Sequence, residues 1–178
     1  MKTLLVLAVL LPSFSLHAEE EPAAAPSATK TARVAFGQYC FWTGEMKLGQ
    51  IEGVVRTEAG YFQGQEVTLV EYEPARISLE TLAARAKEAG VADHLHLLTR
   101  SQFEGNAIAG VAIGAPLDRS YRTAPASDQK KQLEGTPYAR LKLTPEQATK
   151  INAFVRVDPA RARAWFTAPQ RAALASSR

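Results

Sequence analysis

The sequence is poor in cysteine, histidine and methionine: its 178 residues include one Cys, three His and two Met. A single cysteine cannot close an intramolecular disulfide, so the chain is not a disulfide-stapled scaffold. No glycine-rich phosphate loop, Ser–His–Asp order or pair of catalytic carboxylates stands out. The formal net charge of +3 is small and the charges are scattered, so we expect no binding to nucleic acid.

The few histidines give little basis for a metal site. His94 and His96, in the segment HLHL, would lie on one face of a strand. A closed metal site typically needs about four ligands, and no cysteine lies near them in the sequence. We therefore predict no bound metal.

Long apolar runs are also absent, except at the N-terminus. There Lys2 precedes the run LLVLAVLLPSFSL, and Ala18 ends the segment LHA. This pattern is typical of a secretory signal peptide and is too short for a membrane span. We predict a signal peptide over 1–18, export to the periplasm or medium, and no membrane span once the signal is removed. A Pro/Ala/Glu-rich flexible linker over 19–30, one domain over 31–166 and a tail over 167–178 complete the predicted organisation.

Hydrophobic periodicity predicts that strands and helices alternate in this domain. Strands are expected in 31–37, 53–62, 66–73 and 94–99. Helices are expected from Cys40 to about residue 51, and in 78–90, 143–155 and 157–166. Thr144 and Gln147 form a capping-box pattern, although Gly44 and Gly49 weaken the first helix. The sum is an α+β domain with a mixed sheet and packed helices.

The lone cysteine lies in the segment FGQYCFWTGE, next to Phe41 and Trp42. A strand-to-helix junction at Cys40 would place the thiol at a helix N-terminus, which favours the nucleophilic thiolate. The two aromatic side chains could then wall an apolar pocket for a methyl or thioether group. The alternative is a buried structural cysteine among aromatics, a common role for a free cysteine.

The wider pattern resembles the peptide methionine sulfoxide reductase A family. The resemblance covers residues 31–90 and is most specific in the Cys-Phe-Trp element. It resumes in EVTLVEYEPARISLETL, which is similar to the family's strand, turn and helix start. It implies an α+β fold of the ferredoxin-like or methionine sulfoxide reductase A-like type. The matching positions in the first part are Phe36-Gly37, Cys40-Phe41-Trp42, Glu45, Gly53-Val54, Thr57 and Gly60-Tyr61.

The resemblance also implies residue roles in a peptide-methionine (S)-S-oxide reductase. Cys40 would attack the sulfoxide sulfur, and Phe41, Trp42 and Tyr61 would bind the substrate. Glu66 matches the family's proton donor, six residues before the Tyr of its YEP turn. The resulting sulfenic acid would be reduced by an external thiol, such as a thioredoxin-like protein, and no cofactor is implied. In the later segment SYRT, Tyr121 matches the family's tyrosine that donates a hydrogen bond to the sulfoxide oxygen.

The chain also departs from the family pattern. Only residues 62–65 separate Tyr61 from Glu66, where the family has a longer loop, and there is no second cysteine to form a resolving disulfide. We expect a monomer that acts on methionine sulfoxide in a protein or a small molecule. Two alternatives stay open: a module that binds a thioether or methionine sulfoxide without turnover, and a cell-envelope thiol or copper redox protein. The charges of the later segment SDQKKQLEGTPYARLKLTPEQATKINA, residues 127–153, are expected to be a solvated surface.

Overall fold

The computed structural model describes residues 30–98 and 105–176. The predicted signal peptide lies outside these residues, as does the predicted linker except for Lys30. No helix of the described chain is long and apolar enough to cross a membrane.

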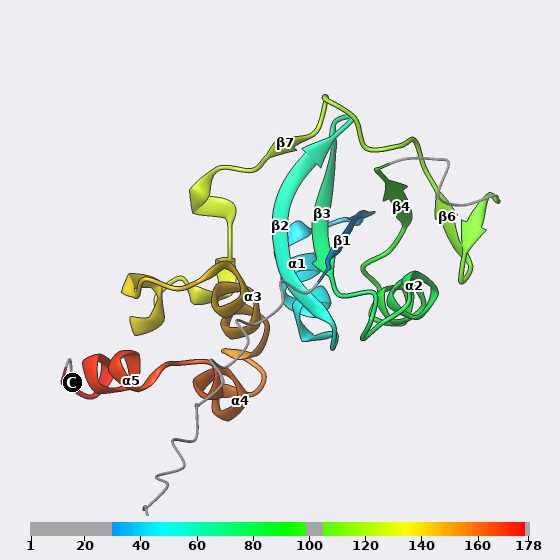
Figure 1. Cartoon of the computed structure of the whole chain (residues 1–178). Helices are drawn as coiled ribbons and strands as arrows, with labels where there is room; N and C mark the ends of the chain where they lie inside the picture. The colour runs from blue at the N-terminus through cyan, green and yellow to red at the C-terminus, as the bar shows by residue number, and fades with distance from the viewer. Residues whose placement is uncertain (1–29, 99–104, 177–178) are drawn as a thin grey trace, which may run out of the picture.

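The first six elements form a βαββαβ unit (Figure 1). They are β1 (Ala32–Gly37), α1 (Phe41–Gln50), β2 (Val54–Phe62), β3 (Gln65–Tyr72), α2 (Leu79–Glu88) and β4 (His94–Leu97). The four strands are antiparallel in the order β4-β1-β3-β2. This is the ferredoxin-like arrangement, in which each helix connects two strands across a third.

Short strands extend the sheet on both sides, and helices follow it in the chain. The strands β5 (Ala107–Ile108), β6 (Val111–Ile113) and β7 (Arg122–Thr123) complete the order β5-β6-β4-β1-β3-β2-β7. Because β6 pairs with β4 in parallel, the sheet is mixed. The 3-10 helices η2 (Ala126–Asp128), η3 (Lys131–Leu133) and η4 (Pro137–Arg140) precede α3 (Pro145–Phe154), α4 (Pro159–Ala164) and α5 (Ala168–Ser176). The predicted α+β class is confirmed, and the predicted tail contains α5.

Helix α1 forms despite its two glycines because each of them allows a close approach. A Cβ on Gly44 would lie 2.4 Å from the Thr68 hydroxyl oxygen, and one on Gly49 would lie 3.0 Å from the Ala153 Cβ. The glycines therefore mark where α1 touches β3 and α3. They cost helix propensity, and the packing of both helix faces offsets that cost.

The predicted capping residues act as caps. The Ser78 hydroxyl accepts a hydrogen bond from the Thr81 N–H at the start of α2. Thr144 and Gln147 form a reciprocal capping box at the start of α3. Each cap satisfies N–H groups that have no partner inside their own helix.

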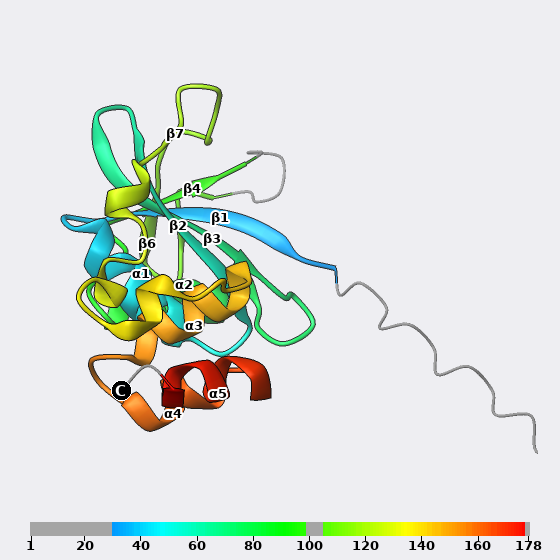
Figure 2. The same ribbon diagram turned by 90° about the vertical axis from the view of Figure 1, so that its left-hand side faces the viewer.

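The main apolar core lies between the sheet and the helices α1 and α2, which Figure 2 shows on the same side of the sheet as α3. A second cluster joins α3 and α4, and it includes Ile151, Phe154 and Phe166. A small third cluster lies on the other face of the sheet, with Phe62 and Leu69. The central strands β1 and β3 are consequently buried on both faces.

Polar contacts also attach α3 to α1 and β2. The Lys150 ammonium donates to the carbonyls of Gly49 and Ile51, at 2.9 and 3.1 Å, where α1 ends. The Thr57 N–H of β2 donates to the Thr149 hydroxyl at 3.1 Å. Burial lowers the pKa of Lys150 to about 8. The side of α3 that faces α1 is therefore buried but partly polar.

Candidate active site at the N-terminus of helix α1

Cys40 is the N-cap residue of α1, as the sequence predicted. Its backbone is extended, with φ −140° and ψ 110°, and α1 begins at the next residue, Phe41. The Cys40 side chain makes no capping hydrogen bond and is half-buried. The thiol is therefore beside the positive end of the helix dipole and remains available to a reactant.

The sheet register brings Glu66 to the same place. Gln63 and Gly64, with φ of 51° and 79°, form a two-residue hairpin turn between β2 and β3. The turn pairs Tyr61 directly with Glu66. The Gln38 N–H, just after β1, donates to the Glu66 carbonyl at 3.3 Å. The short link between Tyr61 and Glu66 thus sets both residues at the sheet end from which Cys40 emerges.

The Glu66 carboxylate binds the start of α1. Its Oε2 accepts a hydrogen bond from the Phe41 N–H at 2.8 Å, an amide that has no partner inside the helix. In the described part of the chain, no group hydrogen-bonds its other oxygen, Oε1. Glu66 is thereby fixed next to Cys40, and one carboxyl oxygen is left for a further ligand.

These residues line a cavity of about 370 Å³. Five of the six predicted site residues contribute to it, namely Cys40, Phe41, Trp42, Tyr61 and Glu66, together with Tyr39 and Asp128. The Phe41 ring packs edge-on against Tyr61, with ring centroids 5.4 Å apart, and lies 6.1 Å from Trp42. An aromatic wall and a carboxyl group therefore face the same half-buried thiol.

The structure does not bring Tyr121 into this cavity. Its hydroxyl donates to Glu58 at 2.8 Å, and its ring packs on Gly60. Glu58 and Gly60 point to the opposite face of β2 from Ala59 and Tyr61, because side chains alternate along a strand. Burial, and then the hydrogen bond to Glu58, raise the pKa of Tyr121 above its usual range. Tyr121 therefore has a structural partner, away from the thiol.

The segment over residues 124–131, here called the strap, was missed as part of the site. The strap runs along the outside of β2 between β7 and α3 (Figure 1). Its residue Asp128 lines the cavity with Cys40 and Glu66. The sequence offered no local signal for this, because Asp128 lies 88 positions after Cys40 in a segment without clear periodicity.

Two consecutive strap residues anchor it to the core. The Gln129 amide accepts from the Ala59 N–H at 3.0 Å and donates to the Ala59 carbonyl at 2.8 Å. The Lys130 N–H donates to the Glu45 carboxylate at 2.7 Å, and the Lys130 ammonium bonds both Glu45 and the Thr57 carbonyl. Glu45 is fully buried. The expectation of a solvated charged surface is thus wrong for Lys130, because a buried carboxylate on α1 binds it.

The Lys131 side chain lies over the Trp42 ring at one edge of the aromatic wall. Its ammonium lies 5.0 Å from the centroid of the Trp42 ring, a cation–π arrangement. It also pairs with Glu134 at 2.7 Å. The Trp42 side chain is held at the cavity by the strap as well as by α1.

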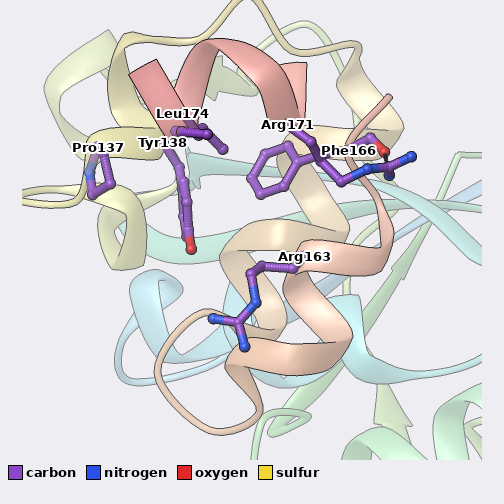
Figure 3. Close-up of a pocket in the computed structure, with 7 residues that line it drawn as sticks. Pro137, Tyr138, Arg163, Phe166, Arg171 and Leu174 are labelled. Atoms are coloured by element: carbon purple, nitrogen blue, oxygen red, sulfur yellow. Dashed lines mark hydrogen bonds between the residues drawn. The ribbon is translucent and has the colours of Figure 1, made fainter. Parts of the chain in front are cut away.

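The other features of the described chain lack this chemistry. A larger cavity, of about 560 Å³, has no thiol or carboxylate among its lining residues (Figure 3). It is formed by residues of η4, α4 and α5, among them Tyr138 and Arg163, and by Phe166 between α4 and α5. Of the predicted histidine pair, His96 is buried with Nδ1 at 2.9 Å from the Ala115 carbonyl, and His94 stacks beside it. No cluster of three or more potential metal ligands occurs in the described ranges.

The comparisons with known proteins identify relatives of one kind. No family model matches the chain. It is 35% identical over 104 residues to a peptide methionine sulfoxide reductase MsrA of Pseudomonas syringae pv. tomato, covering 49% of this chain and 46% of that protein. It is 33% identical over 90 residues to MsrA 1 of Rhizobium meliloti, covering 40% and 42% of the two chains. The chain thus matches less than half the length of these relatives.

A comparison with solved structures gave a weaker likeness. Methionine sulfoxide reductase A of Corynebacterium diphtheriae is 17% identical, with a TM-score of 0.31, over 80% of this chain and 63% of that one. A likeness at this level carries no argument about the site. The sequence matches show that the chain is similar to peptide methionine sulfoxide reductases of the A type over half of its length or less.

Proposed function

We propose that this protein is an exported, thiol-dependent reductase of methionine sulfoxide, acting on the (S)-sulfoxide, free or in peptides. One observation carries the proposal: Cys40 caps α1, and Glu66 accepts a hydrogen bond from the next amide at 2.8 Å. The nucleophile and the acid of the reaction are thereby held at one helix N-terminus. The relatives that the chain matches over half of its length or less are named peptide methionine sulfoxide reductases.

The proposed step uses the two groups in complementary roles. The Cys40 sulfur attacks the sulfoxide sulfur while Glu66, in its protonated form, transfers its proton to the sulfoxide oxygen. The hydroxyl then moves from the substrate sulfur to the Cys40 sulfur: the S–O bond of the substrate and the transient sulfur–sulfur bond both break, a sulfenic acid is left on Cys40, and the thioether is released. The free Oε1 of Glu66 is the oxygen available to face the substrate.

The aromatic wall suits the apolar end of the substrate. Phe41, Trp42 and Tyr61 surround the cavity at Cys40, and aromatic rings pack favourably against a thioether methyl or sulfur. Tyr39 and Tyr61 also bring phenol groups to the cavity rim. Either of these can donate a hydrogen bond to the sulfoxide oxygen, whereas Tyr121 faces the other side of β2.

The catalytic cycle needs an external reductant. The sequence supplies no second cysteine to attack the sulfenic acid. Two external thiols, or one thioredoxin-like dithiol, would instead reduce Cys40, with release of water and formation of the reductant's disulfide. A monomer suffices for this scheme, and the N-terminal signal pattern supports a reaction in the periplasm or outside the cell.

The test is turnover of separated (S)- and (R)-methionine sulfoxide by the mature protein with dithiothreitol. We expect thioether formation from the (S) form, complete loss in Cys40→Ser, and a loss of about 100-fold or more in Glu66→Gln. Glu80→Gln, an exposed carboxylate on α2, is the matched control and is expected to keep the rate. In a single turnover without reductant, dimedone should trap one sulfenic acid per thioether formed.

The same experiment identifies the non-catalytic alternative. A methionine sulfoxide peptide that binds equally well to the wild type and to Cys40→Ser, with no thioether formed by either, would make the cavity a binding site only. A Glu66→Gln variant with an unchanged rate would contradict the assigned proton donor.

A further inference from the structure

Asp128 is an ionisable group in the cavity that the proposed reaction does not use. It lines the cavity together with Cys40 and Glu66. Its backbone N–H bonds the Pro125 carbonyl. Within the described residues, nothing donates a hydrogen bond or pairs with its carboxylate. The carboxylate is therefore free to bind a group that enters the cavity.

The position of Asp128 is fixed by its neighbours in the strap. Gln129 is clamped to both backbone groups of Ala59, and Lys130 is held by the buried Glu45. These anchors follow Asp128 directly in the chain. A carboxylate placed this way loses little conformational entropy when it binds a ligand, so it can act as a specificity group.

The charges of the cavity lining are unbalanced. The lining contains the two carboxyl groups of Glu66 and Asp128, and no lysine, arginine or histidine. Glu66 serves as the proton donor in the proposed reaction. Lys131, the nearby cation, is paired with Glu134 and lies over Trp42. Among the described residues, Asp128 forms no salt bridge; the Lys131 ammonium attracts its carboxylate from a longer distance. Asp128 thus lies beside exposed aromatic faces with its carboxylate accessible to a ligand.

Carboxylates and aromatic faces both attract cations. Tyr39, Trp42 and Tyr61 are exposed at this cavity to 95%, 37% and 38%. Resting on the proposed function, we propose that Asp128 and these rings form a subsite for a cationic group adjacent to the methionine sulfoxide. The cation is an ammonium or guanidinium, either the α-amino group of methionine sulfoxide itself or a neighbouring Lys or Arg side chain.

The test compares kcat/KM for peptides that differ in one charge. Acetyl-Gly-Met(O)-X-Gly-amide with X as Lys, Gln or Glu measures a side-chain cation, and Met(O)-Gly-amide with a free or acetylated amine measures the α-amino group. We expect a Lys-over-Glu or free-over-acetylated preference of up to about fivefold, the size expected for an accessible ion pair. The preference should weaken in high salt.

The matched variants separate the subsite from general electrostatics. Asp128→Asn should remove the Lys-over-Glu or free-over-acetylated preference in kcat/KM. Glu88→Gln removes one exposed carboxylate on α2 and should keep the preference. A preference for X = Lys over X = Glu identifies a side-chain cation as the ligand of the subsite. A preference for the free over the acetylated amine identifies the α-amino group.

The outcomes distinguish this inference from the proposed function. Turnover with no charge preference, or a preference that survives Asp128→Asn, overturns the subsite and leaves the reductase in place. If no peptide is turned over, the reductase proposal fails, and the dissociation constants of the same peptides for Cys40→Ser decide the subsite. If Cys40→Ser binds the X = Lys peptide more tightly than the X = Glu peptide, and adding Asp128→Asn removes this difference, the subsite is supported. Equal dissociation constants for the peptides overturn the subsite.

Discussion

Two regions of this molecule contribute to one cavity. The interactions that stabilise the first region differ from those that attach the second region to it. The βαββαβ unit over residues 32–97 packs through an apolar core between its sheet and the helices α1 and α2. The strap and α3 dock onto that unit through polar contacts centred on Lys130, Gln129 and Lys150. Ala124 of the strap adds an apolar contact with Phe41 and Ala59. The first region supplies the Cys40 thiol and the Glu66 carboxyl group, and the second supplies Asp128 and the Lys131 contact with Trp42.

The difference teaches that completing the site depends on a few long-range polar bonds. Apolar packing is non-directional and roughly proportional to area, so it tolerates small shifts. A buried carboxylate such as Glu45 accepts only a partner with the right geometry, and leaving it unpaired is costly. The strap is therefore fixed in one position relative to α1.

The largest effect on stability is expected when the polar contact that attaches the strap to α1 is removed. Lys130→Met leaves the fully buried Glu45 without its cation. We expect a loss of about 3–5 kcal/mol in the free energy of unfolding, measured by urea denaturation. Lys131→Met, which removes an exposed cation one residue later, is the control and should cost much less. Equal losses in the two variants would contradict the role assigned to the buried pair.

A comparable effect is expected in the apolar region, with a different consequence for the site. Leu82 of α2 is fully buried in the main core, so Leu82→Ala should cost about 2–5 kcal/mol in urea denaturation. Because Leu82 does not line the cavity, kcat/KM under folding conditions should stay unchanged, whereas Lys130→Met should also impair turnover. The half-buried Leu79 gives the milder control, Leu79→Ala. Equal changes in kcat/KM for Leu82→Ala and Lys130→Met would contradict this difference between the two regions.

A smaller effect is expected at the start of α3, which presents Thr149 and Lys150 to the first region. Thr144→Ala removes the capping hydrogen bond to the Gln147 N–H. The cost should be about 1 kcal/mol in the free energy of unfolding, while Thr144→Ser keeps the hydroxyl and most of the stability. A Thr144→Ala variant as stable as the wild type would show that packing alone fixes this end of α3.

The last effect appears only above neutral pH and concerns Lys150. Burial lowers its pKa from 10.5 to about 8 in the folded protein. The unfolded chain therefore binds more protons between pH 8 and 10.5, and stability should rise with pH in that window. The unfolding free energy of the wild type relative to Lys150→Met should consequently increase from pH 8 to pH 10. A difference that stays constant or falls would mean that the two carbonyl partners keep Lys150 charged.

Much of the first region followed from the sequence. The predicted strands, the helix beginning after Cys40 and the caps of α2 and α3 all occur where local patterns indicated. The structure adds that Tyr61 and Glu66 pair directly, because a short hairpin pairs the residues on either side of its turn. Local chemistry sufficed here, since each of these features depends on residues close together in the chain.

The second region did not follow from the sequence. SDQKKQLEG suggested a solvated surface, yet Lys130 is bound by Glu45, which lies 85 positions earlier. SYRT suggested a residue of the site, yet the alternation of side chains along β2 places Tyr121 with Glu58 on the other face. Neither outcome is visible in a local window, because each depends on which side chains meet after the chain has folded.

The sequence by itself determined the helix start at Cys40, the hairpin that carries Glu66 and the α+β class, because periodicity, capping and turn chemistry act over a few residues. Only the tertiary structure decided that the Glu66 carboxylate binds the Phe41 amide, that Asp128 completes the cavity and that Tyr121 stays outside it. These are contacts between distant segments, and their geometry is set by the sheet register and by the buried bonds of Glu45.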